Sequence, residues 1–142
     1  MMITDDSIKY IGEGVIARTL PKAKWTHQGH LLAALYWHRH CANLVRDGKI
    51  GEVIRRYNEA TGVINSDNSG YHETITLAYL RMTRWFLDRS AATQPLAEIA
   101  QALLQSRFAA RDWPLIYWRA ATLFSPSARL NWVEPDIQTL PF

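Results

Sequence analysis

Residues 25–41 read Trp-Thr-His-Gln-Gly-His-Leu-Leu-Ala-Ala-Leu-Tyr-Trp-His-Arg-His-Cys and hold four of the chain's five histidines and its single cysteine. Thr26 is a good N-cap, because its side-chain oxygen can accept from the free amide groups of a first helical turn. The apolar residues that follow recur at helical spacing. This stretch therefore predicts a helix over 26–46, which Asp47-Gly48 closes because glycine commonly follows the last helical residue.

The histidines of this helix do not all face the same way. At 3.6 residues per turn, His27, His30 and His38 lie along one side, with Cys41 beyond them, and His40 projects elsewhere. The pair His27/His30 is close enough to share an ion, although the His-Glu-x-x-His pattern of metalloproteases is absent. The alternative is that both are first-turn residues bonded to solvent or backbone.

Composition limits the class of protein. With 142 residues, 48% of them hydrophobic, the chain is predicted to form one helical domain over 1–142 with a sizeable core. A net charge of +3 without a basic run argues against a nucleic-acid partner. One cysteine excludes an internal disulfide and suits a reducing compartment. The start is not typical of a signal peptide and no stretch matches a membrane span, so we expect a cytoplasmic protein with no membrane partner.

The rest of the chain also shows helical spacing and no strand pattern. Helices are predicted over 6–18, 49–60 and 71–88, from Gln94-Pro95 onward, and from an Asp112 cap to about 123. Three prolines interrupt residues 125–142, which are predicted to form a short turn and an extended tail packed on the body. The expected fold is an all-α, single-domain bundle of about five to six helices.

Geometry suggests that the fifth histidine, His72, meets the first two. The helix over 26–46 spans about 30 Å and the helix over 49–60 returns about 18 Å, and the loop 63–70 is long enough to cover the difference. Alternate helices of an antiparallel series run parallel. The first turns of the helices that carry His27 and His72 are therefore expected at one end, with both imidazoles in a shared cavity.

The predicted site follows from this convergence. His27, His30 and His72 are the candidate ligands of a divalent metal such as zinc, nickel or iron, and a helix N-terminus favours the neutral imidazole that a metal needs. Glu73 is the candidate catalytic residue, as a proton acceptor for metal-activated water or substrate. The alternative for Glu73 is a capping carboxylate at the third helical position, with Gly70 as the cap.

Several motifs together resemble a known family. They are Trp-Thr-His-Gln-Gly-His at 25–30, Arg-Arg-Tyr-Asn at 55–58, Tyr-His-Glu-Thr-Ile-Thr at 71–76 and Trp-Val-Glu-Pro-Asp at 132–136. From about Leu20 onward the chain is similar to a family of small uncharacterised bacterial helical proteins. By a looser analogy, three histidines in a helical bundle resemble the DinB-like metal-binding proteins.

The sequence is compatible with three functions. The first is a histidine-rich polar pocket that binds a divalent metal and binds or acts on a small molecule. The second is a metal-free small-molecule binding protein that uses the same residues. The third is a protein–protein interaction module, which would expose an apolar patch.

Overall fold

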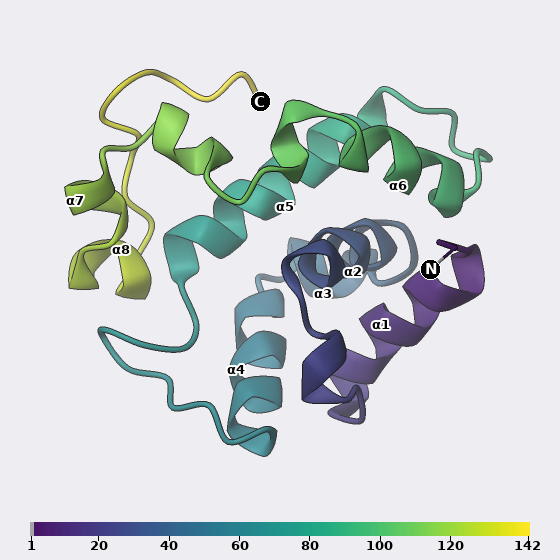
Figure 1. Ribbon diagram of the computed structural model, residues 1–142, viewed down its shortest axis with the longest axis horizontal. Coiled ribbons are helices and arrows are strands. Elements are labelled where there is room, and N and C mark those ends of the chain that lie inside the picture. The colour runs from purple at the N-terminus through teal and green to yellow at the C-terminus, as the bar shows by residue number, and fades with distance from the viewer. Residues whose placement is uncertain (1) are drawn as a thin grey trace.

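The computed structural model describes residues 2–142, and its regular structure is entirely helical (Figure 1). The all-α prediction is confirmed, since residues 2–142 contain no strand. The α-helices are α1 (Asp5–Ala17), α2 (His27–His40), α3 (Ala42–Arg46), α4 (Ile50–Ala60), α5 (Glu73–Asp88), α6 (Leu96–Leu104), α7 (Ala120–Leu123) and α8 (Pro126–Leu130). Three 3-10 turns, η1 (Lys22–Lys24), η2 (Arg107–Ala109) and η3 (Trp113–Ile116), lie between them. No helix of residues 2–142 is long and apolar enough to cross a membrane.

Helix α2 is the centre of the molecule. Residues 31–38 are buried without exception, and the helix packs on α1, α3, α5 and α6. Such a helix must be apolar on nearly every face. Its contact with α1 is close at Gly12, whose carbonyl accepts from the Trp37 indole at 3.0 Å. A Cβ at Gly12 would come within 2.5 Å of the Tyr36 ring, so this contact requires glycine.

The predicted helix over 26–46 is divided in two. Thr26 caps it as expected, and Gly48 closes it with a positive φ of 68°. Cys41, however, takes a non-helical conformation with φ −130° and ψ 40°, which ends α2 and separates the short α3. No glycine or proline marks this break in the sequence.

The C-terminal part also departs from the prediction. Asp112 makes no capping hydrogen bond, and a 3-10 turn replaces the start of the expected helix. The indole of Trp118 is buried and donates to the carbonyl of Val133 at 2.9 Å. Where a short turn was predicted before the extended tail, the helix α8 forms, because Ser125 caps it and Pro126 occupies its first position.

Residues after α8 have no helix and lie on the body. The amide of Ile137 donates to the carbonyl of Tyr117 at 2.9 Å. The Phe142 ring lies 5.7 Å from the ring of Phe108 and 5.9 Å from that of Trp113, as centroid distances. Asp136 accepts from the backbone amide of Arg119 at 2.8 Å. The tail is thus fixed by both aromatic and polar contacts.

Helices α2 and α5 cross rather than run parallel. His27 and His38 are about three turns apart along α2, yet His27 meets Tyr79 of α5 edge-on and His38 bonds to the carbonyl of Leu80. Neighbouring residues of α5 thus contact both ends of α2. In Figure 1, α2 is seen almost end-on whereas α5 runs across the view. The predicted parallel arrangement of these helices is not found.

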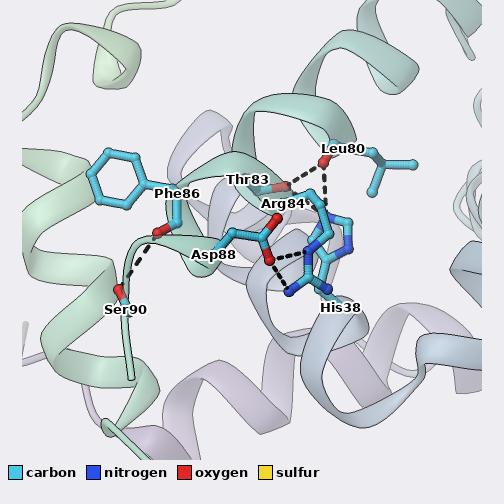
Figure 2. A network of polar contacts seen from close by, with 7 residues as sticks. All are labelled: His38, Leu80, Thr83, Arg84, Phe86, Asp88 and Ser90. Atoms are coloured by element: carbon cyan, nitrogen blue, oxygen red, sulfur yellow. Dashed lines mark hydrogen bonds and ion pairs between the residues drawn. The ribbon is translucent and has the colours of Figure 1, made fainter. Parts of the chain in front are cut away.

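His38 fixes this crossing. Figure 2 shows its imidazole against α5, where Nε2 lies 2.9 Å from the carbonyl oxygen of Leu80 and 3.0 Å from Oγ1 of Thr83. A carbonyl can only accept, so Nε2 carries the proton. The ring is buried, and this burial lowers the pKa of His38 to about 4.

Replacing His38 with alanine should destabilise the protein by about 2–4 kcal/mol, because the change leaves a cavity and removes a buried hydrogen bond. His40 is exposed, so His40→Ala should change the stability by less than about 0.5 kcal/mol. Urea denaturation of both variants measures the difference. Equal losses in the two variants would contradict this role of His38.

Candidate functional site

A cavity of about 370 Å³ lies between α2, α4 and α5, next to the connection between η2 and η3. We call it the histidine cavity. Most of its wall is apolar or aromatic. This part is formed by Trp25, Ala34, Trp37, Ile50, Ile54, Ile75, Tyr79 and Leu80. The polar remainder is Thr26, His27, His30, Thr76 and Arg111. Two of the three predicted metal ligands therefore share one cavity.

The first turn of α2 builds the polar wall. Oγ1 of Thr26 accepts from the amide of Gly29 at 3.1 Å, which is the predicted N-cap bond. The carbonyl of Thr26 also accepts from Nδ1 of His30 at 2.6 Å. A Cβ on Gly29 would lie 2.8 Å from the carbonyl oxygen of Lys24, so glycine is needed for this tight approach. Contacts within residues 25–30 thus specify the position of the His30 ring.

Trp25 holds His30 from the other side. The two rings stack with centroids 3.7 Å apart and planes inclined by 26°. Trp25 also meets Tyr57 of α4 edge-on at 5.7 Å. Stacking on one face and a hydrogen bond at Nδ1 leave His30 little freedom to rotate.

Backbone carbonyls fix the tautomers of both histidines. Nε2 of His27 donates to the carbonyl of Ala109 at 3.0 Å, and Nδ1 of His30 donates to that of Thr26. The remaining nitrogens, Nδ1 of His27 and Nε2 of His30, have no hydrogen-bond partner in the protein and are not sealed from solvent. In the neutral rings each of these nitrogens carries a lone pair. The cavity wall therefore presents two hydrogen-bond acceptors to a bound ligand.

Burial keeps these imidazoles neutral. It lowers the pKa of His30 to about 4, and the Arg111 guanidinium and His27 push that pKa in the same direction. The pKa of His27 is likewise lowered, mainly by burial and further by Arg111. Burial raises the pKa of the Tyr79 phenol to about 12, so this group is also uncharged at neutral pH.

Arg111 is the one formal charge of the cavity wall at neutral pH. Its side chain is exposed, and it takes part in no ion pair within residues 2–142. No aspartate or glutamate lines the cavity. The site is thus an apolar pocket with one cation at its border.

His72 is not part of this wall. It is the N-cap of α5: its Nδ1 accepts from the amide of Ile75 at 3.1 Å, and its Nε2 donates to the carbonyl of Leu123 at 2.7 Å. Both ring nitrogens are used inside the protein, so neither is free for a metal. The expected convergence of His72 with His27 is not found, because α2 and α5 cross.

Glu73 also lies outside the cavity wall. It is the first residue of α5, one position after the His72 cap, so the alternative capping scheme with Gly70 does not hold either. Its Oε1 accepts from the Tyr71 hydroxyl at 2.6 Å, and the Arg55 guanidinium lies 4.5 Å above the Tyr71 ring. Tyr71 thus links Glu73 at the start of α5 to Arg55 of α4.

The arrangement gives little support to a metal centre. Residues 2–142 contain no group of three or more histidine, cysteine, aspartate or glutamate side chains able to hold a metal ion. The pair His27/His30 offers two nitrogens, but Arg111 places a positive charge beside them. Metal ions of the zinc type usually take at least three protein ligands. Metal binding by His27, His30 and His72 stays a prediction.

The sequence did not reveal Arg111 as part of the site. This residue lies in an irregular connection, which the bond from His27 to Ala109 ties to the start of α2. Thr76 and Tyr79 of α5 also line the cavity. A pattern based on helical spacing identifies residues on one helix but not a partner from a distant turn.

Comparison with known proteins adds no assignment: no protein-family model, curated protein or solved structure matches the chain. The resemblance to a family of small bacterial proteins accordingly stays a prediction.

The role of His72 can be tested with two substitutions. His72→Ala should destabilise the protein by about 1–2 kcal/mol, because it removes both the cap and the link to Leu123. His72→Asn should recover part of this loss, since asparagine is a good N-cap. Urea denaturation measures both variants. An alanine variant as stable as the wild type would contradict the capping role.

Acid should weaken the fold. The pKa of His38 is about 4 in the folded protein and about 6.5 in the unfolded chain. Between these values only the unfolded state takes up the proton, so stability is complete above about pH 6.5 and falls as the pH is lowered towards 4. We expect a loss of about 2 kcal/mol from His38 at pH 5.

Urea denaturation at pH 7.5 and pH 5 measures this loss. His38→Gln should show a smaller difference between the two pH values, because glutamine does not titrate. A wild-type stability that stays constant between these pH values would refute the prediction.

Proposed function

We propose that the protein binds a small molecule in the histidine cavity without the help of a metal. The main support for this proposal is the combination of a largely apolar wall with two neutral imidazoles held by backbone carbonyls. Ligand sites in proteins are typically apolar pockets with a few well-placed polar groups. This is the second of the functions that the sequence left open.

The size of the cavity supports the proposal. Its volume of about 370 Å³ lies at the lower end of the range of about 300–1,000 Å³ for small-molecule sites. A compact, largely apolar ligand is therefore a better fit than a large cofactor.

The two histidine side chains of the cavity are held in place before a ligand binds. His30 is held by the Trp25 ring and by the carbonyl of Thr26, and His27 is held by the carbonyl of Ala109. Groups that are fixed before binding lose little conformational entropy when a ligand arrives. Such preorganisation favours specific recognition.

Metal binding is the second candidate, and it depends on the two free nitrogens of His27 and His30. If it occurs, elemental analysis of untagged protein should show stoichiometric metal, which His27→Ala and His30→Ala should each remove. Because His72 has no free nitrogen, metal loss in His72→Ala without loss of fold would favour the three-histidine site instead.

A neutral fluorescent probe tests small-molecule binding. The fluorescence of N-phenyl-1-naphthylamine should rise on addition of the wild-type protein, because the probe leaves water for an apolar cavity. Thr76→Trp places an indole in the cavity from α5 and should reduce this binding at least roughly tenfold, a loss that corresponds to about 1.4 kcal/mol. Thr139→Trp, at an exposed position of the tail, is the matched control and should bind as the wild type does.

Near-ultraviolet circular dichroism should show that both tryptophan variants are folded. Absence of probe binding to the wild type, or equal binding by the two variants, would overturn the proposal.

A further inference from the structure

We infer that the ligand of the histidine cavity is an aromatic carboxylic acid with a neutral hydrogen-bond donor close to the acid group, an inference that rests on the proposed small-molecule function. The carboxylate pairs with Arg111, the donor faces the free nitrogens of His27 and His30, and the aromatic body fills the apolar part.

The single positive charge in the cavity wall favours an anionic ligand. Arg111 is the only charged residue in the wall, and no acidic residue lines the cavity with it. Asp112 borders a neighbouring hollow that Arg111 also lines, but the two side chains form no ion pair. An arginine in this position can bind a carboxylate through two parallel hydrogen bonds.

The hydrogen-bond balance calls for a donor beside the acid. Nδ1 of His27 and Nε2 of His30 are both acceptors, because each ring already donates its proton to a backbone carbonyl. Arg111 follows the His27 partner Ala109 by two positions and lines the same wall as both rings. The donor and the carboxylate of the ligand therefore lie near one another.

The remaining wall favours an aromatic body. The rings of Trp25, Trp37 and Tyr79 line the cavity together with aliphatic side chains of α4 and α5. Aromatic rings pack favourably against one another in offset or edge-on arrangements. A single aryl ring also agrees with the small volume of the cavity.

Three probes with nearly the same body separate these features. Mandelate carries a carboxylate and a neighbouring hydroxyl, phenylacetate lacks the hydroxyl, and 1-phenyl-1,2-ethanediol lacks the charge. Each is titrated against the complex of the protein with N-phenyl-1-naphthylamine, and its displacement of the dye gives its dissociation constant. Both enantiomers of mandelate and of the diol are used.

We expect the better mandelate enantiomer to bind roughly tenfold more tightly than the diol, because its charge forms charge-assisted hydrogen bonds with Arg111. It should also bind several-fold more tightly than phenylacetate, which leaves the histidine acceptors unpaired. Arg111→Met should abolish the preference for the acid over the diol. Arg119→Met removes the same charge from an exposed position outside the cavity and should keep the preference.

The outcomes distinguish the two proposals. If the dye binds but the acids do not displace it better than the diol, or if Arg119→Met acts as Arg111→Met does, the ligand class is wrong while small-molecule binding stands. If the dye itself does not bind, the proposed function fails.

Discussion

The burial of α2 on every side is the constraint on which the rest of the structure depends. A helix in this position must satisfy its polar side chains within the protein, because an unpaired buried polar group is costly. His38 meets this requirement by donating to the carbonyl of Leu80, and His27 by donating to that of Ala109. His27 and His38 thus act as neutral links between segments, and their lowered pKa values follow from the same burial.

The two histidine-containing motifs, residues 25–30 and 71–76, have different roles in the structure. Residues 25–30 form a cap, a stacked ring pair and the polar wall of the cavity. Residues 71–76 mainly join parts of the chain: His72 reaches Leu123, and the Thr74 hydroxyl donates to the carbonyl of Asn131 at 2.7 Å. Only the end of this second segment contributes to the cavity, through Ile75 and Thr76. Sequence patterns alone treat the two histidine groups alike.

Local signals predicted the fold well and the site in part. Caps, glycine stops and apolar spacing located α1, α4 and α5 to within a few residues, because these features depend on nearby positions. The spacing of His27 and His30 also placed them correctly on one face. Whether a ring nitrogen is free depends on a carbonyl far along the chain, as Leu123 is for His72. The crossing of α2 and α5 likewise results from packing between distant residues, which no local pattern specifies.

The bond between His27 and the carbonyl of Ala109 joins residues 82 positions apart, and this separation has a consequence for folding. Contacts of such long range close late, because the entropy of a large loop must first be overcome. Helices α1, α2 and α4 are joined by shorter loops, so they can pack together before the connection between η2 and η3, which carries Arg111, packs against α2. During synthesis of the chain the wall of the histidine cavity is therefore complete only after Ala109 and Arg111 have been added and have packed against the start of α2.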